Sequence, residues 1–431
     1  MRNYKFVKFE NRIKSALAVV SILLSALMLC SCNFSLDSIL SILDNKPTKT
    51  VQETTESSTK SEPQREVETS YSYDNLSSDK LKELYMKIDE YAEIASVGYC
   101  IINAPLNEMQ LTEAVEAYKN DHPEVFWLKS DFEYIDNDDS TSLFLSYSVQ
   151  PDNSDPDRLK KAKEKFNRTV DKIIDGAPKN ATDYELELYV NDYLVNNCVY
   201  DKEAAESEKL IGHENDAYGA LVEKKAVCEG YSRAFQLLCN RLGIDCINIS
   251  GTADGESHAW NNVKLDGEWY EVDVTWNDTD GDTEFPIYDY FNLPSDEFSE
   301  SHSTSPLYSE TSLSEYVNSD YYYNVFAPEC TGTKYYYYSY SCVTVYDIND
   351  SEEITNAFAQ AAKNGEKYLD FVIDERLDFN TTADEIIYNG YLAEWIANAN
   401  LANWYTPTLN EEARVYSNEA VNVITVFLEY Y

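Results

Sequence analysis

Residues 217–250, AYGALVEKKAVCEGYSRAFQLLCNRLGIDCINIS, and 251–278, GTADGESHAWNNVKLDGEWYEVDVTWND, carry the strongest structural pattern in the chain. Apolar residues recur at helical spacing after Cys228 and predict a helix that ends at a glycine cap, Gly243. A strand is predicted next, over DCINISGTA. Two further strands are joined at Asp266-Gly267, a dipeptide typical of tight hairpin turns. The stretch therefore predicts a helix followed by antiparallel strands.

Cys228 opens the predicted helix, and this position favours a reactive thiol. Unpaired backbone N–H groups and the positive end of the helix dipole stabilise a thiolate in the first turn. Gly230 is small, and we expect it to allow close approach of a substrate backbone. The alternative for Cys228 is a buried structural cysteine, which is also the role expected for Cys239 and Cys246.

The hairpin register brings an imidazole and a carboxylate together. A two-residue turn pairs Leu265 with Glu268, and counting back places Trp260 opposite Asp273. His258 and Asp273 then share one face as diagonal neighbours within side-chain reach. The three groups predict nucleophilic catalysis, in which Cys228 attacks, His258 transfers the proton and Asp273 orients the imidazole. A coincidence of core residues is the alternative.

These segments resemble the transglutaminase-like superfamily, in V-C-x-G-Y with a helix ending L-G-I, then H-A-W-N, then W-Y-x-V-D-x-T-W. The likeness covers about residues 183–300. It implies an α+β, papain-like core in which the helix bearing the cysteine packs on an antiparallel sheet. It also implies a thioester acyl-enzyme on Cys228, with His258 as base and Asp273 as orienting acid. For the oxyanion we expect the Cys228 N–H as one donor, with Tyr200 or Tyr218 as candidates for the other.

Length and charge limit the remaining possibilities. At 431 residues the chain predicts two or three domains. The net charge of −43 argues against nucleic acid as a partner, because such a surface repels phosphate.

The N-terminus predicts export and anchoring. Residues 1–31 have a basic start and an apolar run typical of a secretory signal. Leu29-Cys30-Ser31-Cys32 resembles the bacterial lipobox, which implies that Cys32 carries a lipid on the extracytoplasmic face of the cell membrane. A soluble secreted protein is the alternative. Residues 32–72 are rich in Ser, Thr, Glu and Pro and predict a disordered tether.

Three folded regions are expected: an N-terminal α+β domain over 73–177, the catalytic core over 178–310, and a C-terminal α/β domain over 311–431. Of the other histidines, His122 is expected to end a helix, His213 to line the cleft, and His302 to be exposed and inert. The acidic run 277–284 lacks the pattern of a calcium loop, so no metal and no cofactor are predicted. Cys330 and Cys342 flank a predicted hairpin and are candidates for a disulfide.

The sequence therefore predicts a membrane-anchored, extracytoplasmic cysteine hydrolase or acyltransferase, most simply a cysteine peptidase. Its expected substrates are protein or peptide amides, including cell-wall peptides. The alternative is a non-catalytic binding lipoprotein that uses the same module as a scaffold. Whether water or an amine accepts the acyl group stays open, as does the oligomeric state.

Overall fold

The computed structural model describes residues 71–94, 99–137, 139–147, 157–207, 212–279, 285–304, 327–402 and 408–431. All of them belong to one compact unit, Arg65–Tyr431. The predicted signal, Cys32 and all but the last two residues of the predicted tether lie outside the described residues. Within the described part of the chain, no helix is both long and apolar enough to cross a membrane.

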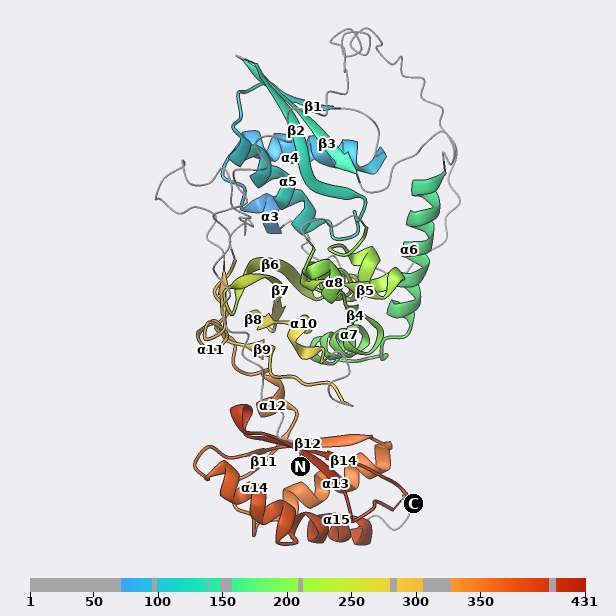
Figure 1. The fold of residues 1–431 in the computed structure, drawn as a ribbon, viewed down its shortest axis with the longest axis vertical. Helices are drawn as coiled ribbons and strands as arrows, with labels where there is room; N and C mark the ends of the chain where they lie inside the picture. The colour runs from blue at the N-terminus through green and yellow to red at the C-terminus, as the bar shows by residue number, and fades with distance from the viewer. Residues whose placement is uncertain are drawn as a thin grey trace. The chain divides into compact units, whose positions relative to one another are not determined.

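The N-terminal region packs helices against a three-stranded antiparallel sheet of order β1-β3-β2 (Figure 1). Helix α5 begins with a capping box in which Asn107 and Gln110 bind each other's backbone N–H groups, as its sequence allows. The elements are α3 (Tyr71–Asp74), α4 (Asp79–Ile94), β1 (Tyr99–Ile102), α5 (Glu108–Asp121), β2 (Leu128–Asn137), β3 (Ser140–Tyr147) and α6 (Arg158–Asp175).

The middle region is built on a five-stranded antiparallel sheet of order β10-β6-β7-β8-β9. The elements that precede the sheet are the helices and short strands α7 (Asp183–Asn197), β4 (Val199–Tyr200), α8 (Lys202–Ala205), the π-helical turn η1 (Gly219–Glu223), β5 (Lys225–Ala226) and α9 (Cys228–Leu242). The sheet and its connections are β6 (Asp245–Ala253), β7 (Glu256–Leu265), β8 (Glu268–Val272), α10 (Val274–Asn277), β9 (Phe291–Leu293), α11 (Ser295–Phe298) and β10 (His302–Thr304).

Helix α9 covers one face of this sheet, because alternate strand residues point toward it. Asn261 of β7 donates to the Ser232 carbonyl of α9, and the Ser232 hydroxyl donates to Asn248 of β6. The opposite face carries Trp260, whose indole donates to Glu271 of the adjacent strand at 2.8 Å. A separate apolar cluster that includes Trp260 and Phe298 fills this second face.

The predicted hairpin turn is confirmed. Leu265 lies opposite Glu268, and the predicted register holds from there to Asn261, which pairs with Val272. Beyond Val272 the predicted strand is wrong, because the chain turns into helix α10, capped by the Asp273 side chain.

The C-terminal region has its own apolar core and a four-stranded sheet of order β11-β12-β14-β13, with helices α13, α14 and α15 on one side (Figure 1). The elements are α12 (Tyr337–Tyr340), β11 (Val343–Val345), α13 (Glu352–Asn364), β12 (Tyr368–Ile373), α14 (Phe379–Tyr388), α15 (Tyr391–Ala402), β13 (Arg414–Asn418), the 3₁₀ turn η3 (Glu419–Val421) and β14 (Val423–Phe427).

Gly390 adopts a φ of 96° and separates helix α14 from helix α15. One expectation for this region is wrong. Cys330 and Cys342 are both free and do not form the candidate disulfide.

Candidate active site

Cys228 is the first residue of helix α9, as predicted. The residue before it, Val227, makes no side-chain cap, and its N–H donates to the Glu214 carbonyl at 2.8 Å. Cys228 is partly exposed, and its thiol lies near enough to the His258 ring to help raise the pKa of that imidazole. A partly exposed thiol at a helix start, beside an imidazole, is the environment of a reactive cysteine.

The other described cysteines differ from Cys228 in their surroundings. Burial raises the pKa of each of these thiols, which keeps them protonated and poorly reactive. They are Cys100, Cys198, Cys239, Cys246, Cys330 and Cys342. The structural role expected for Cys239 and Cys246 fits their complete burial in the core.

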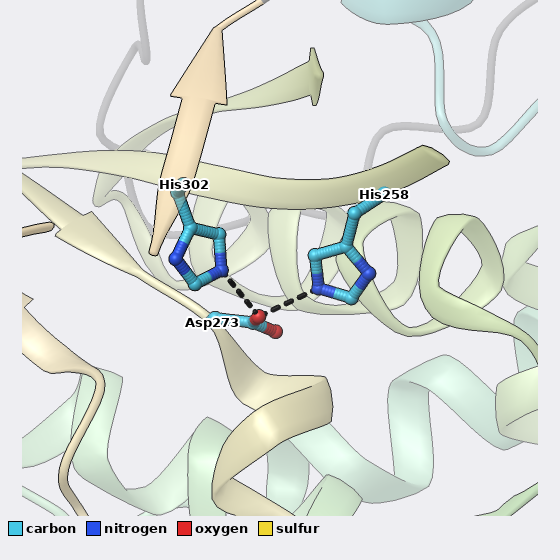
Figure 2. A group of neighbouring side chains, drawn as sticks. All are labelled: His258, Asp273 and His302. Carbon is cyan, nitrogen blue, oxygen red and sulfur yellow. Dashed lines mark hydrogen bonds and ion pairs between the residues drawn. The ribbon is translucent and has the colours of Figure 1, made fainter. Parts of the chain in front are cut away.

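His258 and Asp273 meet as predicted, although Asp273 contacts the histidine from the cap of helix α10 and not from the strand expected there. His258 lies on β7, and its Nε2 is 2.6 Å from Oδ2 of Asp273 (Figure 2). Both side chains are buried. Since Nε2 is taken by the carboxylate, Nδ1 is the ring nitrogen left for Cys228. The structure therefore brings all three predicted site residues together.

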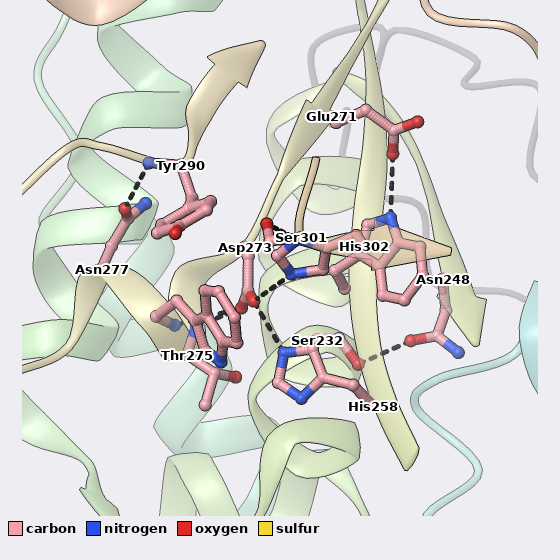
Figure 3. Close-up of polar contacts among 12 residues, drawn as sticks. Ser232, Asn248, His258, Glu271, Asp273, Thr275, Asn277, Tyr290, Ser301 and His302 are labelled. Atoms are coloured by element: carbon pink, nitrogen blue, oxygen red, sulfur yellow. Dashed lines mark hydrogen bonds and ion pairs between the residues drawn. The ribbon is translucent and has the colours of Figure 1, made fainter. Parts of the chain in front are cut away.

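Asp273 is held by four hydrogen bonds. Its Oδ1 accepts from the backbone N–H groups of Thr275 and Trp276, at 2.9 and 3.1 Å, which caps helix α10. Its Oδ2 accepts from His258 and from a second histidine, His302 (Figure 3). A carboxylate offers about four lone-pair directions, so this one is fully used.

The electrostatics of the pair favour its charged form. Burial alone would lower the pKa of His258, but the Asp273 charge and the hydrogen bonds to Asp273 and Cys228 outweigh it and raise that pKa. Burial would raise the pKa of Asp273, and the two histidines lower it instead. The site therefore stabilises an imidazolium beside a carboxylate, the partner that a thiolate needs.

The expectation that His302 is exposed and inert is wrong. It is 3% exposed on the edge strand β10, and its Nε2 lies 3.1 Å from Asp273 Oδ2. The polar sequence ESHSTS reads as a loop, and His302 pairs with Ala253, far away in the chain. Only the pairing of β10 with β6 reveals its position, and no local pattern predicts that pairing.

The other two histidines lie elsewhere. His122 ends helix α5 as expected, and its Nδ1 is 3.0 Å from Glu124. His213 pairs with Asp216 at 2.7 Å and packs edge-on against Phe126, so it takes part in a structural cluster and has no contact with the three site residues.

Of the two tyrosines considered for the oxyanion, Tyr200 is better placed. It lies on β4 and pairs with Ala226 of β5. Ala226 is two residues before Cys228 in the chain. Tyr218 is buried against the rings of Phe126 and Phe166. Tyr200 therefore stays the candidate beside the Cys228 N–H.

The expectation that Gly230 makes room for a substrate backbone is wrong. A Cβ at this position would lie 2.7 Å from the Glu214 carbonyl oxygen and 3.2 Å from that of Asp216. The space beside Gly230 is filled by the chain's own loop, and no substrate backbone approaches there. Glycine is required because this loop packs directly on the first turn of helix α9.

The three side chains His258, Asp273 and His302 also have the composition of a metal site, the one such group within the described ranges. Their contacts are those of hydrogen bonds. Two ligands of a tetrahedral zinc ion lie about 3.3 Å apart, given bonds of about 2.0–2.2 Å. The 2.6 Å separation of His258 Nε2 and Asp273 Oδ2 is too short for both atoms to bind one ion.

In the acidic run 277–284, which was considered for calcium, residues 280–284 lie outside the described residues.

A partly exposed cysteine at a helix start, beside a buried histidine–aspartate pair at an antiparallel sheet, defines a class of papain-like thiol enzymes. The family comparison is specific within that class: residues 168–274 match the transglutaminase-like superfamily, so the chain contains a transglutaminase-like domain. The prediction of an α+β, transglutaminase-like fold is confirmed.

Curated relatives match part of this domain. The chain is 31% identical to mouse (Mus musculus) kyphoscoliosis peptidase over 97 residues, which cover 20% of this chain and 14% of that protein. The human (Homo sapiens) kyphoscoliosis peptidase is 28% identical over 121 residues, covering 25% and 18%. The chain thus spans less than a fifth of the length of these relatives. A solved structure described as a TGase aligns at 18% identity with a TM-score of 0.26, covering 47% of this chain and 60% of that one.

Proposed function

We propose that this protein is a cysteine-dependent amide hydrolase or acyltransferase that acts on protein or peptide amides, with cysteine peptidase the simplest form. One observation carries the proposal: Asp273 fixes one ring nitrogen of His258 at 2.6 Å, and the thiol of Cys228, at the start of α9, lies near enough to help raise the pKa of the same ring. The transglutaminase-like family match over residues 168–274 supports the same chemistry.

The arrangement supports a two-step reaction. The Cys228 thiol gives its proton to Nδ1 of His258, and the thiolate forms a bond to the amide carbonyl carbon. The C–N bond then breaks as His258 returns the proton to the leaving amine, which leaves an acyl thioester on Cys228. Water or a second amine, deprotonated by His258, attacks the thioester, and the C–S bond breaks to restore the thiol. Asp273 keeps the imidazole in the required orientation throughout.

The test compares wild type with Cys228→Ser. Both are incubated with a protein mixture, and mass spectrometry scans together for new termini, deamidation and amine incorporation. We expect at least one of these products with wild type and none with Cys228→Ser. In parallel, iodoacetamide should label Cys228 faster than the other six described cysteines by roughly a hundredfold, because a thiol at a helix start beside an imidazole is more reactive than a thiol with a pKa raised by burial.

Cys239→Ser is the matched control, since it removes a thiol of the same helix that lies in the core. It should leave the products unchanged where the variant folds. Slow and equal labelling of all thiols, with no product, would instead favour a binding scaffold without catalysis.

We also propose that the protein is held at the extracytoplasmic face of the membrane by a lipid on Cys32. This proposal is supported by the sequence alone, through the basic and apolar leader and the Leu-Cys-Ser-Cys motif.

A further inference from the structure

We propose that His302 is a positioning residue of the site: its Nε2–H holds the Asp273 carboxylate in the orientation that aligns His258. This inference rests on the proposed function and adds a fourth residue to its machinery. Figure 2 shows the two rings on opposite sides of Asp273, both directed at the same carboxylate oxygen.

The hydrogen bonds of His302 define which ring nitrogen carries the proton. An ionised carboxylate only accepts, so Nε2 of His302, at 3.1 Å from Oδ2, must donate. The other nitrogen, Nδ1, lies 2.8 Å from the Ser301 hydroxyl (Figure 3). The hydroxyl rotates freely and can donate to Nδ1, which completes a neutral Nε2–H tautomer.

A neutral His302 is also the arrangement that charge favours. The rings of His258 and His302 have centroids 5.7 Å apart and share one carboxylate. Two imidazolium ions at that distance in a buried site would repel each other. His302 therefore provides a donor without a second positive charge, which leaves the carboxylate charge to His258.

The surroundings of His302 hold its ring still. Phe298 packs against it with centroids 3.9 Å apart, and Trp276 lies at 4.6 Å. The ring is almost fully buried, so its hydrogen bond does not compete with water. A residue held this tightly can fix the carboxylate that it contacts.

The sheet explains how two histidines reach one carboxylate. His302 on β10 lies opposite Ala253 of β6, and His258 on β7 lies opposite Gly251 of the same strand. Positions 251 and 253 share a face, and both side chains are minimal. A Cβ at Gly251 would lie 2.2 Å from the Ser303 carbonyl oxygen and 2.5 Å from the Trp260 ring. Strand β6 therefore has small residues, Gly251 and Ala253, next to the two histidines that approach Asp273 from the flanking strands.

The competing explanation is a purely structural histidine that bonds to the nearest acceptor. Two variants separate the explanations. His302→Gln keeps an N–H donor at similar reach, whereas His302→Leu has similar bulk and no donor. For each, the rate of Cys228 alkylation by iodoacetamide is measured from pH 5 to 9, together with the melting temperature.

His302→Leu loses a hydrogen bond to a charged group. In this variant iodoacetamide should alkylate Cys228 about tenfold more slowly than in wild type near pH 6–7, in the range where the thiolate needs the oriented imidazole. His302→Gln should stay within about threefold of wild type. Unchanged rates in folded His302→Leu would overturn the inference. So would equal rates in the two variants with only their melting temperatures lowered, since that is the outcome of a structural role.

A second measurement separates this inference from the proposed function. If wild-type Cys228 proves unreactive, the proposed function fails, and the tautomer of His302 then decides the inference. Two-bond ¹⁵N–¹H NMR spectra, assigned with His302→Gln, should show that His302 is a neutral Nε2–H ring, and an Nδ1–H ring would overturn the inference.

The rate of Cys228 alkylation should not change when EDTA is added. A clear change would instead assign His258, Asp273 and His302 to a metal ion.

Discussion

Asp273 connects the two histidines to the backbone of helix α10. One carboxylate oxygen caps the helix, and the other accepts from both imidazoles. Rotation of the carboxylate would break bonds at both ends, so the acid is oriented by the fold itself. At the scale of single residues, the site is therefore set by hydrogen-bond geometry more than by charge alone.

The charged pair predicts a characteristic pH dependence of stability. His258 has a raised pKa, so its contribution is complete below its usual value of 6.5 and is lost as pH rises through the folded pKa, about 10. Asp273 has a lowered pKa, so its contribution is complete above its usual 3.8 and is lost at lower pH. The pair should stabilise the protein most between about pH 4 and 6.5.

Asp273→Asn tests this window. Chemical unfolding at pH 5 should show a loss of about 3–5 kcal/mol relative to wild type, because a buried charge loses its partner. The difference should shrink steadily toward pH 10. Asp254→Asn, the same change at an exposed turn, is the control and should show no such trend. A difference that is flat from pH 5 to 10 would contradict the assigned charges.

At this scale the sequence predicted three of the four residues that converge on the site. Cys228, His258 and Asp273 lie in segments whose local patterns are strong: a helix start and a hairpin with a defined turn. His302 could not be predicted, because it reaches the site through pairing with Ala253, across a turn-rich stretch. Long-range strand pairing of this kind leaves no local periodicity to read.

At the scale of elements, the start of helix α9 is fixed by the loop that packs beneath it. Gly230 touches this loop where any side chain would collide with backbone oxygens, and Val227 donates to the Glu214 carbonyl. Backbone atoms cannot move aside as a flexible side chain does. The position of the thiol therefore depends on the loop residues Glu214 and Asp216 as well as on the helix.

Gly230→Ala should therefore cost about 1–3 kcal/mol of stability through overpacking. It should also slow Cys228 alkylation, because the first turn must shift. Gly212→Ala is the matched control, since the atoms nearest to a Cβ there belong to the flexible side chain of Glu214. Thermal melts and alkylation rates measure both effects. If the two variants behave alike, the loop does not position the thiol.

The hairpin shows what turn chemistry does and does not predict. Asp266 and Gly267 both have positive φ, as the tight turn requires, and the register follows from them. The strand was nevertheless expected to continue past Val272. Asp273 ends it by capping α10, and a capping aspartate inside an apolar run gives no signal that separates it from a strand residue.

At the scale of the whole molecule, the described residues form more than one apolar core. One cluster runs from helix α4 to the sheet of the middle region, and another belongs to the C-terminal region. Composition predicted several folded regions, but not that the first two share a continuous core. Their shared contacts include Arg233 and Gln236 of α9, which donate to the carbonyls of Lys119 and Asn120. The predicted boundaries between domains stay predictions.

The proposed lipid anchor is a prediction about the whole chain. In a bacterial host, the full-length protein should sediment with membranes, and mass spectrometry should find a diacylglycerol on the N-terminal cysteine peptide. Cys32→Ser should release most of the protein from the membrane fraction, because the acyl chains supply the binding free energy. Cys30→Ser is the control and should stay bound. A Cys32→Ser protein that remains on the membrane would contradict the anchor.

Strand β10 also protects the sheet that it completes. The family match ends at residue 274, so a fragment cut at that boundary would keep the nucleophile, the base and the acid. It would lose β10, and β6 would become an edge strand with unpaired N–H and C=O groups along residues 251–253. Exposed edges recruit other chains. Such a fragment should aggregate through β6, and samples intended for crystallisation or assay should extend past residue 304.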